Sequence, residues 1–533
     1  MADRRLRLAT AATYAVLALS MADNTTVGVA VPRIRETFHL GVTSLQWIVA
    51  GYIVAFAGLL FTGGVIGDRY GRRKALVAGI ATFGVGATVA ATAVDWRVLI
   101  VGRVIQGVGA ACSEPGTLSL LRQLHPDDNQ RLRVFGGWAA ASGLALAAGP
   151  VAAGLLVSLG GWRAVFVAEA VAALVAAVVG ALLLPESADP PTGRADVRGQ
   201  VFAALCLIAT TFALIDGQDH GFGSPRVVVA WVVAAAALAM FVSVERRHPE
   251  PVLDLSMFRD RTVSAGLLAA AASTFALFSV LLLVSLDLQI VGGYSGLGTA
   301  GIFTPMTVAM VAAGPVGARW ATRRGPAAPL VAGLVIATVA CLWLDLELVR
   351  PVPVAATVAS LTVLGAGFGL VVAPMVGTVL ARVPARRSGM GAAAVTAGRE
   401  IGGVVGVAVL GAIVNGLLFS RLTQRLVDLG IPVSYRHVVI DAVRRGTSLP
   451  KSSGGSGGGS FLDKLVGAIK QNLTDRTVDA GKAAYVDSVR TALIVAVCVL
   501  AAGAVGVWLL LRHADVGDTR PANLSEPGGN KAG

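Results

Sequence analysis

The sequence contains little charge for its length. Of its 533 residues, 14% are Asp, Glu, Lys or Arg, whereas 55% are hydrophobic. An ordinary soluble domain carries about 25% charged residues. A soluble chain of this length would also need several domains joined by polar linkers. The mean hydropathy of +0.73 is too high for such a protein. The composition therefore excludes a soluble multidomain protein.

Metal, disulfide and nucleotide motifs are also missing. The four cysteines all lie in apolar runs without a CxxC pair, so neither a disulfide framework nor a metal site is expected. The six histidines are scattered over loops and chain ends, which argues against a membrane enzyme with clustered His and Asp ligands. A phosphate-binding GxxxxGK[ST] is absent, which excludes an ATP-driven pump of that type. We expect no enzyme activity, no metal and no cofactor.

Long apolar runs are what the sequence does contain. Runs of about 20 nearly uncharged residues recur from end to end, each able to cross about 30 Å of hydrocarbon as a helix. Arg4, Arg5 and Arg7 precede a full-length run, so no cleavable signal peptide is expected. The pattern predicts an all-α polytopic membrane protein with fourteen transmembrane helices, near residues 8–32, 44–66, 75–94, 98–121, 134–158, 163–184, 199–217, 227–244, 262–287, 299–318, 328–345, 354–381, 388–418 and 487–511.

The basic residues are distributed unevenly between the two sides. Connectors after even-numbered runs hold most of them, as in Arg69–Lys74, Arg122–Arg133 and Arg382–Arg387, whereas short connectors after odd-numbered runs hold few. Because cytoplasmic loops carry the excess of Lys and Arg, both termini are predicted to be cytoplasmic. The formal charge of +13 is therefore explained by membrane topology and does not indicate a nucleic-acid partner.

The connector at 419–486 is unusually long. Its two ends carry apolar residues at helical spacing, which predicts an extracytoplasmic helical hairpin. Between them, SSGGSGGGS at 452–460 is a flexible spacer by composition, and it is either natural or an engineered replacement. The hairpin either gates the outer mouth, contacts a partner, or forms a lid without an active role. The tail at 512–533 is predicted to be a disordered cytoplasmic segment.

Several motifs together resemble one transporter superfamily. The connector after the second run carries a glycine and charge pattern, and it resembles the loop signature of the major facilitator superfamily at Gly64, Asp68, Arg69, Gly71, Arg72 and Arg73. RVIQGVGAA in the fourth run resembles the second motif of that superfamily. GLALAAGPVAAGLL in the fifth run resembles its antiporter motif, with matches at Gly149, Pro150 and Gly154. MADNTTVGVAVPRI resembles the first-helix pattern of the fourteen-span drug:proton antiporter branch.

This resemblance implies a fold and a domain plan. The implied fold has two six-helix bundles with two helices inserted between them, at the seventh and eighth runs. The expected units are an N-terminal bundle, an inserted pair, five helices of the C-terminal bundle, the hairpin, the last helix and the tail, at residues 1–184, 185–261, 262–418, 419–486, 487–511 and 512–533.

The resemblance also implies roles for the motifs. Asp68, Arg69 and Arg73 would form a conformational latch, whereas the alternative is an ordinary loop that only sets topology. In the fifth helix, Gly143, Gly149 and Gly154 would allow close helix contact and Pro150 would bend the helix. In antiporters this motif is thought to seal the outer half, and a generic packing face is the alternative.

Ionisable residues inside membrane helices are costly and are functional candidates by default. The predicted proton-coupling or substrate residues are Asp23, Arg103, Glu114, Asp287 and Glu400. A carboxylate in an apolar cavity can exchange protons near neutral pH. The alternatives are structural: Asp23 pins a helix kink, Arg103 bonds to carbonyls, and Asp287 lies at the membrane interface. Glu169, Asp216 and Arg399 stay without an assigned role.

The predicted function is proton-coupled efflux of lipophilic, often cationic compounds across the bacterial cytoplasmic membrane by alternating access. The transporter is expected to be a monomer whose partners are the bilayer, protons and a small lipophilic substrate. The alternative within transport is a dedicated exporter of one metabolite, antibiotic, siderophore or lipid. A channel is less consistent with the sequence, because it would need pore rings or a filter loop, usually from symmetric subunits.

Overall fold

The computed structural model describes residues 2–38, 40, 42–187, 196–248, 251, 253–294, 296–348, 354–384, 388–431, 436 and 461–512. Every regular element in those ranges is helical. The helices are α1 Ala2–Phe38, α2 Val42–Tyr70, α3 Arg72–Ala91, α4 Trp96–Leu124, α5 Asp128–Leu183, α6 Val197–His220, α7 Pro225–Glu245, η1 Leu255–Arg259, α8 Arg261–Leu286, η2 Asp287–Val291, α9 Gly296–Arg324, α10 Ala327–Glu347, α11 Val354–Arg382, α12 Ser388–Asp428 and α14 Phe461–Leu511. The Gly/Ser spacer and the tail after Arg512 lie outside the described residues.

Twelve segments of the described chain are long and apolar enough to cross a membrane. One of them belongs to α5, which is interrupted by non-helical backbone at Gly160 and Gly161 and so consists of two helices. Gly161 has a φ of 71°, a conformation that favours glycine. The helix α4 is not counted among these twelve segments, because its buried polar residues lower its mean hydropathy. With 29 residues, it is nevertheless long enough to cross a membrane. Counted in this way, the structure is consistent with the fourteen predicted helices.

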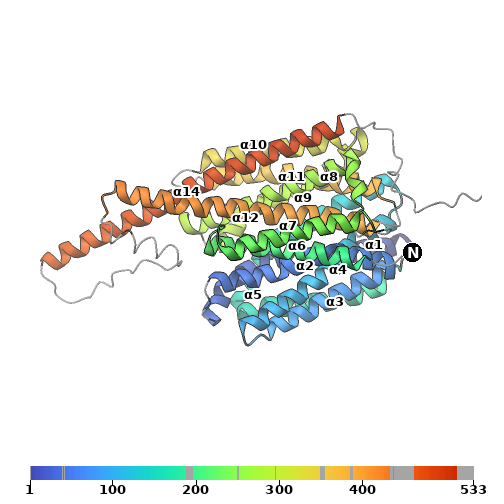
Figure 1. Cartoon of the computed structure of the whole chain (residues 1–533), viewed down its shortest axis with the longest axis horizontal. Coiled ribbons are helices and arrows are strands. Elements are labelled where there is room, and N and C mark those ends of the chain that lie inside the picture. Colours follow the sequence, from blue (N-terminus) through green and yellow to red (C-terminus); the bar gives the residue numbers. More distant parts are fainter. Residues whose placement is uncertain are drawn as a thin grey trace, which may run out of the picture.

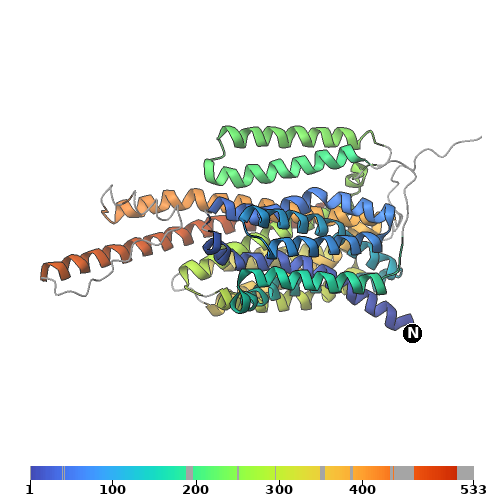
Figure 2. The ribbon, with the colours of Figure 1, turned by 90° about the horizontal axis from the view of Figure 1, so that it is seen from below.

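The helices form two bundles of six and one separate pair. The N-terminal half contains α1 to α4 and both parts of α5, and the C-terminal half contains α8 to α12 and α14 (Figure 1). Figure 2 shows α6 and α7 beside each other on one side of the bundles. This pair packs on α2, where Phe212 lies 6.0 Å from Trp47 between ring centroids. The pair occupies the place predicted for the two inserted helices.

The helices α12 and α14 extend beyond the rest of the bundle, at the end opposite to the N-terminus (Figure 1). Leu422, Leu426 and Ile431 of the first extension form a separate apolar cluster with Ala480 and Ala484 of the second. The helix α14 is continuous from Phe461 to Leu511 and so passes through the boundary predicted at residue 487. Residues 482–502 contain neither glycine nor proline, so nothing in the sequence ends a helix there.

Glycines allow the helices of the N-terminal half to pack closely. A Cβ on Gly109 would lie 2.3 Å from the backbone nitrogen of Phe83, and one on Gly63 would lie 1.9 Å from the carbonyl oxygen of Ala111. That carbonyl is four residues before Pro115, whose ring nitrogen cannot bond to it. The approach of Gly63 therefore occurs where α4 has lost a helical hydrogen bond. These contacts hold α4 in the centre of its bundle, with Arg103 and Glu114 buried.

Candidate functional site

The predicted latch joins the two halves of the protein through Asp68. This residue lies near the end of α2, and its carboxylate accepts a hydrogen bond from Arg72 Nε at 2.9 Å. The same carboxylate accepts the backbone N–H of Gly389, at 2.9 Å to Oδ2 and 3.2 Å to Oδ1. Gly389 is the second residue of α12, so the carboxylate binds one of the N–H groups that a helix leaves unpaired at its start. The helix dipole also favours a negative charge there.

Two more contacts bring the halves together near Asp68. A Cβ on Gly64 would lie 2.7 Å from the carbonyl oxygen of Gly389, so both glycines are needed for this approach. Arg122, at the end of α4, donates a hydrogen bond to the carbonyl oxygen of Val383 at 2.8 Å. The two halves therefore meet closely at the end of the molecule where α2 and α4 end.

The other latch residues contact their own half. Arg73 lies 3.4 Å from Glu186 and donates to the carbonyl oxygen of Leu184. Gly71 has a φ of 115° and connects α2 to α3. The guanidinium of Arg69 lies over the ring of Tyr70, 5.8 Å from its centroid. Arg72 is the arginine of the predicted latch that pairs with Asp68, at 2.7 Å.

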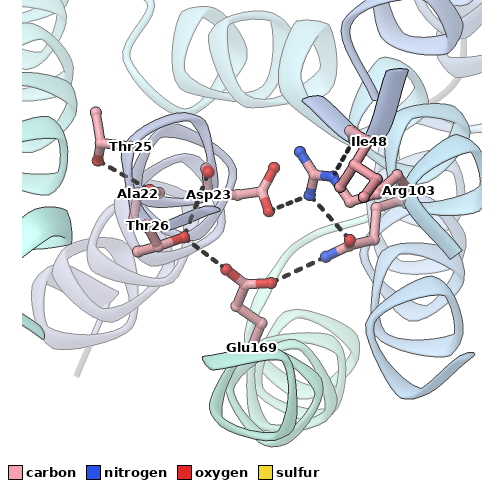
Figure 3. A network of polar contacts seen from close by, with 8 residues as sticks. Ala22, Asp23, Thr25, Thr26, Ile48, Arg103 and Glu169 are labelled. Carbon is pink, nitrogen blue, oxygen red and sulfur yellow. Dashed lines mark hydrogen bonds and ion pairs between the residues drawn. The ribbon is translucent and has the colours of Figure 1, made fainter. Parts of the chain in front are cut away.

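A buried polar network lies inside the N-terminal half (Figure 3). Asp23 of α1 is fully buried and forms an ion pair of 2.5 Å with Arg103 of α4, which is 1% exposed. Arg103 also donates to the side-chain oxygen of Gln106 at 3.0 Å and to the carbonyl oxygen of Ile48 at 3.3 Å. Its guanidinium lies 4.6 Å from the ring centroid of Tyr52. The structure therefore brings two of the predicted site residues into direct contact.

Glu169 belongs to this network, although the sequence did not assign it a role. It lies in the second part of α5 and is 6% exposed. Its carboxyl group shares a hydrogen bond of 2.8 Å with the hydroxyl of Thr26 and accepts one from Gln106 at 3.0 Å. The one sign of a functional role in the sequence was an acidic side chain inside an apolar run. The sequence could not show its partners, because they lie 143 and 63 positions away.

A second charged cluster lies between the two halves. Glu114 of α4 is fully buried and lies 3.8 Å from Arg399 of α12. Arg399 also reaches Trp138 of α5, whose ring centroid is 5.2 Å from the guanidinium, and the sulfur of Met21. Glu400, the next residue, is 5% exposed. Among the described residues, neither oxygen of Glu114 makes a hydrogen bond, whereas Asp23 has a hydrogen-bonded ion pair with Arg103.

One cavity between the halves is small in this conformation. A cavity of about 30 Å³ lies beside Arg399, between α5, α8, α9, α11 and α12. Its walls include Trp138, Phe278, Met310 and Phe368. Sites for drug-sized ligands occupy about 300–1,000 Å³. The cavity is therefore closed here and would have to widen to admit a substrate.

A larger cavity lies elsewhere and has a different character. It measures about 1,260 Å³ and lies between the extended ends of α12 and α14. Its lining includes Arg421, Arg425, Asp479, Asp487 and further charged residues. Such a charged and open cleft does not suit a lipophilic ligand. In the part of the chain that the structure describes, no group of His, Cys, Asp or Glu could hold a metal ion.

The remaining predicted residues lie apart from both clusters. Asp287 is 1% exposed, so its side chain is buried within the protein. It lies thirteen residues beyond Thr274, whose hydroxyl donates to the carbonyl oxygen of Arg399 at 2.6 Å, and this corresponds to about 20 Å of helix. Asp216 lies 3.2 Å from His220 in α6, outside both bundles.

The antiporter motif contacts other helices at two of its three predicted glycines. A Cβ on Gly149 would lie 2.2 Å from the hydroxyl oxygen of Thr25 in α1, and one on Gly143 would meet Met310 of α9. Gly154 makes no such contact in this conformation, because nothing lies within 4 Å of a Cβ there. At about 100° per residue, position 154 points well away from position 149. Ala153, which is fully buried, faces the bundle in its place. The side chain of Pro150 lies outside those that the structure describes.

Comparison with solved structures supports the arrangement of the helices. A proton:xylose symporter, XylE, superposes with a TM-score of 0.57 over 76% of this chain and 88% of its own, at 14% identity. A bacterial homologue of the human lysosomal transporter Spinster superposes with a TM-score of 0.55 over 94% and 96%, also at 14% identity. At such identities, these similarities show the fold alone.

Comparison with characterised sequences adds closer relatives. The multidrug efflux pump LfrA of Mycolicibacterium smegmatis is 32% identical over 92% of this chain and 94% of its own. The methylenomycin A resistance protein of Bacillus subtilis is 31% identical over 74% and 84%. The multidrug resistance protein Stp of Mycobacterium tuberculosis is 28% identical over 91% and 88%. The profile of the Major Facilitator Superfamily matches residues 13–407. The chain is therefore a membrane protein that belongs to the major facilitator superfamily.

Proposed function

We propose that this protein exports lipophilic, often cationic compounds across the bacterial cytoplasmic membrane in exchange for protons. The observation that carries the proposal is the pair of buried charged clusters, one around Asp23 and Arg103 and one around Glu114 and Arg399. Buried charges in membrane helices mark ion and substrate pathways. The efflux and resistance functions of the named relatives support the same reading.

The two clusters suit different parts of an exchange cycle. The Asp23 network lies within one half, where a proton can be held apart from the substrate. Glu114 faces Arg399 across the boundary between the halves, beside the small cavity. A lipophilic cation entering a widened cavity would replace Arg399 as the partner of Glu114. Antiport follows if protonation of the acids and binding of the cation exclude each other.

Alternating access requires the halves to close at one end and open at the other. The contacts of Asp68 with Gly389 and of Arg122 with Val383 close the end where α2 and α4 end. The arginine-rich connectors at this end support its assignment to the cytoplasm. We therefore assign both termini to the cytoplasm and this conformation to the state that is closed towards it. We further propose that the protein acts as a monomer.

The proposal can be tested in proteoliposomes that contain a pH-sensitive dye. A proton gradient is imposed, ethidium is added, and substrate-dependent proton flux is recorded for the wild type, Asp23→Asn and Glu114→Gln. We expect flux in the wild type and its loss in at least one variant. Glu36→Gln is the matched control, because the side chain of Glu36 is 64% exposed and pairs with its helix neighbour Arg33. Absence of flux with any lipophilic cation, in a folded wild-type protein, would refute multidrug exchange.

A second candidate function is export of one dedicated compound. It is favoured by relatives named for single antibiotics, including the methylenomycin A resistance protein and a tetracenomycin C resistance and export protein of Streptomyces glaucescens, which is 32% identical over 77% of this chain. A panel of cationic and neutral compounds in the same assay separates the two functions. A dedicated exporter would respond to one chemical class only.

A further inference from the structure

Glu169 is placed to take part in proton binding together with Asp23. Both carboxylates lie in the core of the N-terminal half, at 6% and 0% exposure, and both connect to Arg103 (Figure 3). Asp23 contacts the guanidinium directly, and Glu169 reaches it through Gln106. The network therefore contains two acids and one permanent positive charge.

The charge balance requires one proton in this network. If both acids were ionised, the cluster would carry a net charge of −1 among buried side chains. An uncompensated buried charge is strongly disfavoured, and such a group neutralises itself by binding a proton. One proton on either acid leaves a neutral cluster of one carboxylate, one guanidinium and one carboxylic acid.

The hydrogen bonds indicate which acid holds that proton. The hydroxyl of Thr26 lies 2.8 Å from Glu169 Oε1 and 3.3 Å from the carbonyl oxygen of Asp23. A hydroxyl has one hydrogen and can donate to only one of these two oxygens. Both contacts are hydrogen bonds if Glu169 is protonated, donates to Thr26, and Thr26 donates to the carbonyl. Asp23 then stays ionised beside Arg103.

Among the described residues, Arg103 is the positive charge that acts on Glu169. On α2 the nearest is Tyr52, which lies under the guanidinium of Arg103. On α3, which also packs against the second part of α5, the charged residues are Arg72, Arg73 and Lys74 at its start. Beyond Tyr52, Glu114 of α4 and Glu400 of α12 add negative charge and face Arg399 as well.

We propose that Glu169 is a second proton-binding residue of this transporter, and that it holds one proton while Asp23 pairs with Arg103. This inference rests on the proposed proton exchange and extends it by naming a residue. When Asp23 and Arg103 separate, the Asp23 carboxylate loses its counter-charge and competes with Glu169 for the proton. The exchanged proton is then bound by Glu169 or by Asp23, depending on the state of the transporter.

Infrared difference spectroscopy of the purified protein in lipid tests this directly, without substrate or transport. The carbonyl stretch of a protonated carboxylic acid is recorded at neutral pH for the wild type, Glu169→Gln and Asp23→Asn. We expect Glu169→Gln to remove one band. Asp23→Asn should weaken the same band, because Glu169 then becomes the only counter-charge of Arg103 and releases its proton. Glu36→Gln should change nothing.

A wild-type band that Glu169→Gln leaves intact would overturn the proposal. A transport measurement adds a second readout: Glu169→Gln should retain exchange of ethidium for ethidium but lose the ethidium-driven proton flux. An equal loss of both activities would assign Glu169 a structural role and would also overturn the proposal. If the wild type shows the band but transports no cation, proton exchange with drugs fails while the assignment of the proton to Glu169 stands.

Discussion

The carboxylate of Asp68 accepts the backbone N–H of Gly389, a residue 321 positions later in the chain. The contact joins the end of a helix in one half to the first turn of a helix in the other. It exists only while the halves are close together at this end, whereas the ion pair between Asp68 and Arg72 lies within one half and does not depend on their approach. Such a contact biases a two-state equilibrium by its own free energy.

Asp68→Asn should therefore open this end of the molecule. An amide oxygen is a weaker acceptor and no longer interacts with the helix dipole, so we expect a loss of about 2 kcal/mol, or a ~30-fold change in the equilibrium. Spin labels at Tyr70→Cys and Arg319→Cys, with the four native cysteines replaced, report the distance between the halves by pulsed electron resonance. The distribution should shift to longer distances. An unchanged distribution would mean that other contacts hold this end closed.

Alanine at Gly389 should open the same end for a steric reason. Its Cβ would lie 2.5 Å from the carbonyl oxygen of Gly64 and 2.6 Å from Asp68 Oδ2, so α2 and α12 must move apart. Gly411→Ala is the matched control in the same helix, since nothing lies within 4 Å of its Cβ, and there alanine should favour the helix by about 0.5–1 kcal/mol. The same pair of labels measures both variants. Equal distances in the two variants would contradict the prediction.

Removal of Arg103 should destabilise the N-terminal half. Loss of one partner from a buried ion pair costs about 3–5 kcal/mol, because the other charge stays behind. Arg103→Met should thus melt at a lower temperature in detergent than the wild type. The double variant Arg103→Met/Asp23→Asn should recover much of this loss, while proton-coupled transport stays absent in both. A double variant that is less stable than Arg103→Met alone would show that the side chains act separately.

The sequence allowed the helices to be predicted more fully than the contacts. Apolar runs bounded by arginines predicted the helices, because a membrane helix satisfies its own backbone and needs only local composition. The partners of Glu169 and Arg399 could not be predicted, since each joins helices that are far apart in the chain. The resemblance to a known loop motif singled out Asp68. It did not show that Arg72 would be its partner, because the choice among neighbouring arginines depends on the direction of each side chain around the turn at Gly71.

A double-mutant cycle tests the contact between Glu114 and Arg399. These side chains are 3.8 Å apart and at most 7% exposed, and they belong to opposite halves. If the pair acts as one unit, Glu114→Gln and Arg399→Gln should each impair transport of ethidium, and the double variant should be no worse than the more impaired single variant. Neighbouring side chains in such double-mutant cycles typically show coupling energies of about 0.5–3 kcal/mol.

The matched cycle combines Glu114→Gln with Arg421→Gln, which lies in the same helix as Arg399 but in the extension beyond the bundle, where it bonds to Thr491. These two effects should simply add, because the residues share no partner. Additive effects for Glu114 and Arg399 as well would mean that their proximity does not couple them. A coupling energy found only in the Arg399 cycle would show that Glu114 interacts with Arg399 of the opposite half during transport. Exchange of a proton for a cation at this boundary requires such an interaction.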